Sequence, residues 1–442
     1  MNRRVSSFPD GARGAIAAAA MVAACAAGCN AGSAKPKVEA RGSAAGSAAG
    51  AASGPASGAA AGSGAPAGSL GSGAPTVAEL VGLPGKRLYV ALCQPCHGAD
   101  AKGYAADHAP SLINPTFLES ATDDFLHRSI AGGRPGTSMA AYGKGRGGPL
   151  DDAAVDRLVR YLRDQGPPAH DLPPTAPGNP TTGGGVYVRR CAVCHGDVRT
   201  RGEAMSLVNA GLLGDASDAF LRHAIVHGRP GTKMEAFAGV LTDTEIDGVI
   251  AFLRLLGSAA APVEPLPAPT GKEPLVINPT GKSPHFALRS DPCPPPQPGL
   301  ASPCKPDPRF VSVEQVGAAL AARQRMVIID ARPASEWRRV HIAGAVSIPY
   351  LDMQRLDEMP RDGTWAVAYC ACPHHLSGIV VDELRRRGYT NAVVLDEGIN
   401  EWHRRGLPVV AAAGVMPPPG EAPPLPQVTF PGQPQPAQPP VR

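Results

Sequence analysis

A five-residue pattern that occurs twice constrains this chain more than any other feature. The string C-Q-P-C-H at residues 93–97 recurs as C-A-V-C-H at residues 191–195. The surroundings recur as well, because G-R-P-G-T-S-M at residues 133–139 is matched by G-R-P-G-T-K-M at residues 228–234. Motif and context repeat together, so we interpret the sequence as the duplication of a whole domain.

Each C-x-x-C-H string has the spacing of a covalent attachment site for c-type haem. The two thiols add to the porphyrin vinyl groups as thioethers, and the adjacent histidine supplies the proximal ligand to iron. The predicted attachment residues are Cys93, Cys96 and His97 in the first repeat and Cys191, Cys194 and His195 in the second. The sequence therefore predicts two covalently bound haem c groups.

The methionine of each Gly-Arg-Pro-Gly-Thr loop is the predicted sixth ligand. A thioether favours ferrous iron, and the spacing from the histidine suits a chain that passes once around the haem. The iron ligands are then His97 with Met139 and His195 with Met234. The rival ligands are His108 or His127 in the first repeat and His223 or His227 in the second.

Two loop arginines, Arg134 and Arg229, precede these methionines. They have two interpretations of equal weight: fork-shaped donors to a haem propionate, or exposed loop charges.

Amphipathic helices are predicted over residues 150–166 and 241–257, with a capping box of Thr242 and Glu245 at the start of the second. In each repeat a Cys-x-x-Cys-His string, a methionine loop and an amphipathic helix follow one another in the chain. This arrangement resembles a class I cytochrome c, and the resemblance covers residues 76–168 and 178–258. It implies two all-α domains whose six-coordinate iron passes electrons and has no open position for a substrate.

A third domain is expected at residues 309–412. Apolar strands at 326–330, 366–369 and 393–395 alternate with helical patterns at 313–323 and 377–387, which predicts a parallel α/β sheet. The runs V-I-I-D-A-R at 327–332 and H-I-A-G-A at 341–345, with Gly388-Tyr389, Trp402 and Pro408, resemble a rhodanese domain.

By that resemblance Cys370, at the end of a central strand, is the catalytic cysteine that would carry a persulfide. The loop that follows has one residue more than the common form and lacks its arginine, so His374 and His375 are the candidate replacements. Cys372 could resolve a persulfide or join the histidines in a metal site. The alternative is a catalytically inactive rhodanese module used for binding.

The chain begins with a basic and then apolar segment, which predicts a signal peptide over residues 1–28. The residues before Cys29 resemble a lipobox, so a lipid anchor at Cys29 is expected, with ordinary secretion to a soluble periplasmic form as the alternative. An Ala/Gly/Ser-rich tether (29–75), a Pro-rich linker (259–308) and a Pro-rich tail (413–442) are predicted to be disordered.

Charge and the remaining cysteines narrow the function further. A net charge of +4 is too mild to predict nucleic-acid binding. Cys293 and Cys304 could form a disulfide in an oxidising compartment, or remain free thiols.

The sequence thus predicts a periplasmic, membrane-anchored dihaem cytochrome that exchanges electrons with the proteins of a periplasmic or respiratory chain. Small inorganic sulfur compounds are candidate substrates of its rhodanese-like domain, which would add a sulfurtransferase activity. A haem peroxidase, in which one methionine ligand leaves, is a further alternative.

Overall fold

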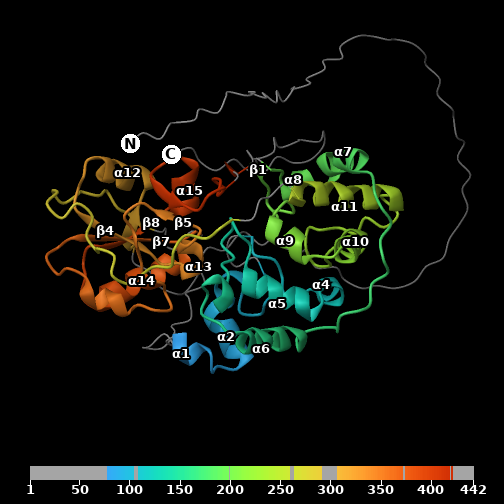
Figure 1. Ribbon diagram of the computed structural model, residues 1–442, viewed down its shortest axis with the longest axis horizontal. Coiled ribbons are helices and arrows are strands. Elements are labelled where there is room, and N and C mark those ends of the chain that lie inside the picture. The colour runs from blue at the N-terminus through green and yellow to red at the C-terminus, as the bar shows by residue number, and fades with distance from the viewer. Residues whose placement is uncertain are drawn as a thin grey trace, which may run out of the picture. The chain divides into compact units, whose positions relative to one another are not determined.

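The computed structural model describes residues 77–103, 108–198, 200–258, 263–290, 306–371, 374–418 and 420–421 (Figure 1). All of them belong to the unit Gly62–Arg442. The predicted signal peptide, Cys29 and the tether lie outside the described residues. So do Cys293, Cys304 and Cys372, most of the predicted tail, and the linker segments 259–262 and 291–305.

The first repeat is helical throughout. Its elements are α1 (Val77–Leu80), α2 (Gly85–Leu92), α3 (Gln94–His97), α4 (Pro115–Ser120), α5 (Asp123–Gly132), the 3₁₀ helix η1 (Lys144–Arg146) and α6 (Asp152–Arg163). The side chain of Thr122 accepts a hydrogen bond at the start of α5, and that of Asp151 does so at the start of α6. These caps satisfy backbone N–H groups that have no partner within the helix.

In the described residues the second repeat follows the same order, without counterparts of α1 and η1 and with one short strand added. It contains α7 (Pro180–Arg190), α8 (Ala192–His195), β1 (Thr200–Arg201), α9 (Ala210–Asp215), α10 (Asp218–His227) and α11 (Asp243–Ser258). The predicted capping box of α11 is confirmed: Thr242 N donates to Glu245 Oε2 at 2.9 Å, and Glu245 N donates to Thr242 Oγ1 at 3.3 Å.

In each repeat the helix that leads into the Cys-x-x-Cys-His string crosses the last helix at a glycine. A Cβ on Gly183 of α7 would lie 1.8 Å from Gly248 O of α11, and one on Gly85 of α2 would lie 2.1 Å from Arg157 O of α6. The absence of side chains lets the backbones touch, which is why α7 lies directly against α11 (Figure 1). An aromatic pair flanks each crossing, Tyr89 with Tyr161 and Tyr187 with Phe252.

The third domain is built on a six-stranded sheet with the order β2-β3-β8-β7-β4-β6. Its strands are β2 (Arg289–Ser290), β3 (Pro308–Val311), β4 (Met326–Asp330), β6 (Val346–Ser347), β7 (Trp365–Tyr369) and β8 (Ala392–Leu395). The strands β3, β8, β7, β4 and β6 pair in parallel, as predicted, and β2 is antiparallel to β3.

Helices and short elements complete this domain. They are α12 (Val313–Ala321), α13 (Ala334–Trp337), the 3₁₀ helix η2 (Gln354–Glu358), α14 (His375–Arg386) and α15 (Gly398–Arg404). The strand β5 (Val340–Ile342) pairs with β9 (Val409–Ala411), and β10 (Gly420–Glu421) pairs with β1.

Part of the segment predicted as a linker joins this sheet. Ile277 exchanges backbone hydrogen bonds with Met326 of β4, and Phe286 is buried with its ring 5.2 Å from that of Trp365. The backbone of Ile277 therefore covers an edge of β4, and the side chain of Phe286 covers part of a face of the sheet, which would otherwise be in contact with water.

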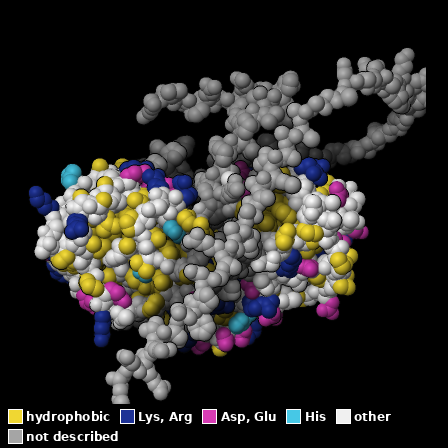
Figure 2. Space-filling model, turned by 45° about the horizontal axis from the view of Figure 1, so that its top comes forward, with side chains coloured by type: hydrophobic (Ala, Val, Ile, Leu, Met, Phe, Trp, Pro, Cys, Tyr) yellow, Lys and Arg dark blue, Asp and Glu magenta, His cyan; other side chains and the backbone are white. Residues whose placement is uncertain are grey.

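On the described part of the face in Figure 2, basic and acidic side chains are interspersed and no broad basic area forms. Among the described residues, no helix combines the length and the apolar character that crossing a bilayer demands.

The glycine crossing generates a first prediction. The Gly183→Ala variant should lower the free energy of unfolding by roughly 1–3 kcal/mol, because its methyl group overlaps the backbone of α11. Gly185→Ala is the matched control. Its methyl group meets only the mobile end of Arg189, so it should be neutral or stabilise α7 by about 0.5–1 kcal/mol. Urea unfolding followed by circular dichroism measures both, and equal losses would contradict the packing argument.

Candidate functional sites

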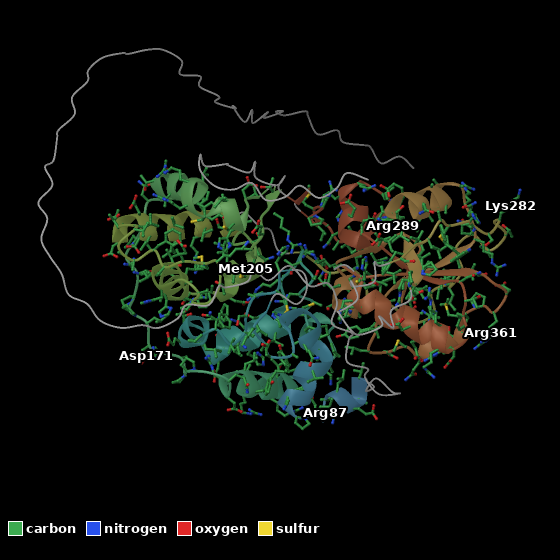
Figure 3. The ribbon with its side chains drawn as sticks, turned by 180° about the vertical axis from the view of Figure 1, so that it is seen from behind. Arg87, Asp171, Met205, Lys282, Arg289 and Arg361 are labelled. Carbon is green, nitrogen blue, oxygen red and sulfur yellow. The ribbon has the colours of Figure 1, made fainter. Side chains whose placement is uncertain are left out.

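The two motif histidines are buried, and each is held by one ring nitrogen. His97 Nδ1 lies 2.8 Å from Pro110 O, and His195 Nδ1 lies 2.8 Å from Met205 O, in the segment between β1 and α9 (Figure 3). A carbonyl oxygen only accepts, so Nδ1 carries the proton and the Nε2 lone pair is left for a metal. Burial lowers the pKa of both imidazoles, which keeps them in the neutral form that can bind iron.

The first thiol of each motif is kept protonated by its apolar surroundings. Cys93 and Cys191 pack against the hydrophobic core. Burial raises the pKa of the Cys93 thiol to about 12 and that of Cys191 to about 11.

A tyrosine locks each motif to the helix that precedes it. The hydroxyl of Tyr89 donates to Gly98 O at 2.6 Å, and that of Tyr187 donates to Gly196 O at 2.8 Å. Each bond joins the last turns of α2 or α7 to the residue after the histidine. The orientation of the motif is therefore fixed by the helix whose position the glycine crossing sets.

The two methionine loops have the same backbone conformation. Arg134 N donates to Met139 O at 2.7 Å, and Arg229 N donates to Met234 O at 2.8 Å. Proline followed by a glycine with positive φ, which is 83° at Gly136 and 79° at Gly231, forms a type II turn. The structure thus presents Met139 and Met234 identically, each partly buried at the end of its turn.

Three of the rival histidines have other neighbours. His127 Nε2 faces the carboxylates of α6, 3.6 Å from Asp156 and 3.9 Å from Asp152. The rings of His223 and His227 pack on each other with centroids 4.4 Å apart. These contacts favour the methionines as the iron ligands.

The interpretation of Arg134 as an exposed loop charge is wrong. Its side chain is 12% exposed and forms an ion pair with Asp215 of the second repeat, with 2.8 Å between Nη1 and Oδ2. Arg229 Nη1 reaches Thr116 Oγ1 of the first repeat at 3.1 Å. No sequence pattern pointed to Asp215 or Thr116, because the pairing joins two separate repeats.

Cys370 follows β7 directly and is buried. Its Sγ lies 3.3 Å from the hydroxyl oxygen of Ser377, in the first turns of α14, and its carbonyl accepts from Ile399 N at 3.0 Å. Ser377 is fully buried. A hydroxyl that donates to sulfur stabilises the thiolate, so this contact is one that a reactive cysteine can use.

The histidines expected to replace the missing loop arginine behave differently from each other. His374 has a positive φ of 70°, and its Nε2 lies 2.5 Å from Asp396 Oδ1 while its ring packs on Phe310. Its imidazole is therefore engaged by the end of β8. Burial lowers the pKa of His375, so this side chain is neutral near pH 7 and is a poor substitute for a permanent cation.

A buried ion pair fixes the strand ends that carry this loop. Arg332 donates Nε and Nη2 to the two carboxylate oxygens of Asp330, at 2.9 and 2.7 Å, and Tyr369 donates its hydroxyl to Asp330 Oδ2 at 2.8 Å. Tyr369 is the residue before Cys370. The network therefore ties β4 to β7 where the candidate cysteine begins its loop.

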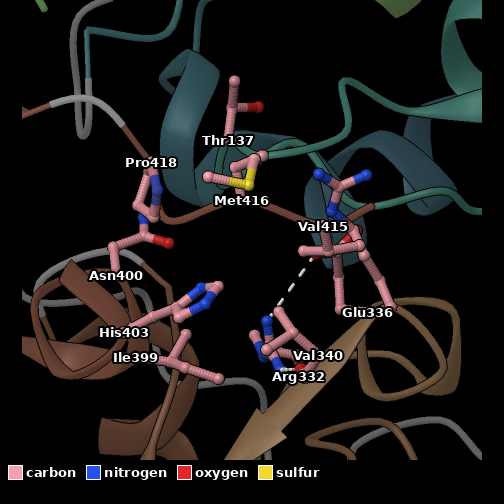
Figure 4. A pocket seen from close by; sticks show the side chains of 12 residues that line it. Thr137, Arg332, Glu336, Val340, Ile399, Asn400, His403, Val415, Met416 and Pro418 are labelled. Carbon is pink, nitrogen blue, oxygen red and sulfur yellow. Dashed lines mark hydrogen bonds and ion pairs between the residues drawn. The ribbon is translucent and has the colours of Figure 1, made fainter. Parts of the chain in front are cut away.

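A pocket lies next to the same loop (Figure 4). Asn400 lines this pocket and donates from Nδ2 to Ala371 O at 3.1 Å. The imidazole of His403 points into the pocket. Its lining residues are Gly136, Thr137, Arg332, Glu336, Arg339, Val340, Ile399, Asn400, His403, Val415, Met416 and Pro418.

Comparison with known protein families identifies all three domains. The family model for cytochrome c oxidase, cbb3-type, subunit III matches residues 82–162 and again residues 178–253. The rhodanese-like domain model matches residues 312–405. This chain carries two cytochrome c domains and a rhodanese-like domain. The resemblances drawn from the motifs are confirmed.

Individual relatives match parts of the chain. A cbb3-type cytochrome c oxidase subunit CcoP from Azospirillum sp. (strain B510) is 28% identical over 191 residues, which are 39% of this chain and 61% of that protein. The dihydro-heme d1 dehydrogenase of Pseudomonas aeruginosa is 42% identical over 85 residues, 19% of this chain and 15% of that protein. A solved rhodanese-related protein from Thermoplasma volcanium is 25% identical and covers 23% of this chain and 97% of its own, with a TM-score of 0.21.

The contact between Cys370 and Ser377 generates a second prediction. The Ser377→Ala variant should shift the pH profile of Cys370 alkylation upward by about one unit, because a hydrogen bond to a charged group contributes about 1.5–3 kcal/mol. The rate of iodoacetamide labelling against pH measures it, in mature protein with Cys293, Cys304 and Cys372 changed to serine. Ser377→Thr keeps the hydroxyl and is the control. Superimposable profiles for all three proteins would show that Ser377 does not act on the thiol.

Proposed function

We propose that this chain transfers electrons in the periplasm through two haem c groups, one on each cytochrome c domain. Thioethers from Cys93 and Cys96 hold the first group and thioethers from Cys191 and Cys194 hold the second. His97 with Met139 and His195 with Met234 are the iron ligands. When bound, each group supplies one-electron redox chemistry, and the chain's own residues orient it and exclude water.

One observation carries this proposal: both motif histidines commit Nδ1 to a backbone carbonyl and keep a neutral ring. The Pro110 and Met205 carbonyls occur on loops of different length, yet both lie 2.8 Å from their imidazole nitrogen. Such a bond orients a ligating imidazole and fixes its tautomer. A histidine that was only part of the core would need neither the two cysteines that precede it nor the tyrosine that fixes the motif to its helix.

The partners follow from the chemistry of the relatives. The cbb3-type relatives are named as oxidase subunits, so redox proteins of a respiratory chain are the proposed partners. This chain spans 61% and 63% of two such relatives. Export to the periplasm and a lipid at Cys29 form the proposed route to the membrane, because haem c is attached to chains after export.

The rhodanese-like domain is proposed to bring sulfane sulfur to Cys370. Two features support this: the cysteine follows the central strand β7, and its sulfur meets the hydroxyl of Ser377. Oxidation of that sulfur would take its oxygen from water and release protons, and its electrons would pass to the cytochrome c domains. A domain that only binds a partner is the competing function, and the response of a Cys370→Ser variant to sulfur donors separates the two.

The haem assignment is tested by cofactor content and by potential. Mature protein should give two equivalents of thioether-linked haem in an alkaline pyridine spectrum. The Met234→His variant should lower one of the two reduction potentials by roughly 100 mV or more, because a thioether ligand raises the potential relative to imidazole.

The matched control is Met205→Leu. Met205 offers only its backbone carbonyl to His195, so both potentials should stay within experimental error of the parent protein. A chain without covalent haem, or a Met234→His variant with unchanged potentials, would contradict the assignment.

The coupling to sulfur is tested with small donors. Thiosulfate, sulfide or polysulfide should reduce the haems of the mature protein at least about tenfold faster than those of the Cys370→Ser variant. Stopped-flow spectra in the visible range measure the rates. Dithionite, which needs no cysteine, should reduce both proteins equally. Equal rates with every sulfur donor would exclude coupling and favour a binding role for the domain.

A further inference from the structure

The two cytochrome c domains meet through equivalent surfaces. Asn114, the residue before α4, donates from Nδ2 to Pro230 O at 2.9 Å, and Asn209, the residue before α9, donates from Nδ2 to Pro135 O at 2.9 Å. Each asparagine thus holds the methionine loop of the other domain. Such reciprocity is the mark of a two-fold arrangement, here within one chain.

Aromatic rings occupy the centre of this contact. Phe125 of α5 and Phe220 of α10 are equivalent residues, and their rings stack with centroids 4.6 Å apart. The guanidinium of Arg134 lies over Phe125 and that of Arg229 over Phe220, each 5.7 Å from the ring centroid. The guanidinium groups of both loop arginines, one from each domain, are therefore partly buried against aromatic rings.

The two domains differ in whether a carboxylate lies next to the loop arginine. Arg134 has the carboxylate of Asp215 at the end of α9, whereas the equivalent end of α4 is Ser120, which bonds its own helix. Arg229 donates to the hydroxyl of Thr116 and the carbonyl of Gly228, and among the described residues it has no ion-pair partner.

Other charged groups at the contact do not remove this difference. Glu119 faces His223 Nε2 at 4.0 Å, and Arg128, which also contacts Asp215, is paired with Asp124 at 2.8 Å. Desolvation lowers the pKa of Arg229 to about 10, so its charge persists at neutral pH. Among the described residues, the second domain therefore carries a buried cation without a carboxylate partner five residues before its methionine, and the first domain does not.

A buried positive charge favours the redox state with one more electron, because the interaction is weakly screened in the protein interior. We infer that Arg229 holds the second haem site at a higher reduction potential than the first, and that Asp215 lowers the first by neutralising Arg134. This inference rests on the proposed function. The two haem sites then differ in reduction potential, so the first electron that enters the protein resides on the second domain.

Potentiometric titration of mature protein, followed by visible spectra, tests the inference. Two one-electron steps are expected. The Met139→His variant should move only the lower step downward, which assigns it to the first domain. The Arg229→Gln variant should then lower the upper step by about 59 mV, a tenfold change in the reduction equilibrium. The Arg229→Lys variant keeps the charge and should leave both steps in place.

Two reciprocal variants test the charges without removing Arg229. Asp215→Asn should raise the lower step, and Thr116→Asp should lower the upper step by giving Arg229 the carboxylate it lacks. Arg160→Gln, which removes an exposed cation from α6, is the matched control and should move neither step.

The outcomes separate this inference from the proposed function. Movement of the upper step in Met139→His, or unchanged steps in Arg229→Gln, would overturn the inference. Should Arg229→Gln fail to incorporate haem, unchanged steps in both Asp215→Asn and Thr116→Asp would overturn it equally. Absence of covalent haem from the parent protein would instead overturn the proposed function.

Discussion

The close approach of two helix backbones at a glycine is the constraint on which each cytochrome c domain depends. At Gly183 and Gly85 there is no room for even one methyl group, so the helix that carries the motif has a single position against the last helix. Tyr89 and Tyr187 then transmit that position to the Cys-x-x-Cys-His turn. This packing orients the thiols and the imidazole, which is the preorganisation a redox site requires.

Duplication alone would give two equivalent sites, and the contact between the repeats makes them different. Both domains offer the same loop, the same proline carbonyl and the same aromatic ring to the other. One position decides the electrostatics: Asp215 stands where the first repeat has Ser120. A single carboxylate in a desolvated contact changes local charge more than many exposed side chains do, because solvent screens the latter.

The rhodanese-like domain joins a well-defined fold to an altered site. Its core network of Asp330, Arg332 and Tyr369 is complete and fully buried, so the ends of β4 and β7 are rigid. The loop after Cys370 has no arginine, and the two histidines that follow are engaged by Asp396 or kept neutral by burial. Next to this loop, Asn400 and His403 line a pocket.

The sequence by itself determined the haem motifs, the duplication, the helix ends and the parallel strands, because each is encoded in residues close together in the chain. The capping box at Thr242 and Glu245 and the strand Met326–Asp330 are examples. Only the tertiary structure decided which carbonyl orients each histidine and that Phe286 packs on the rhodanese-like sheet. It also decided that Arg134 meets Asp215, whereas Arg229 meets no carboxylate of the described residues. Those pairings join residues far apart in sequence, and whether a buried charge is neutralised depends on which surfaces the folded domains bring together.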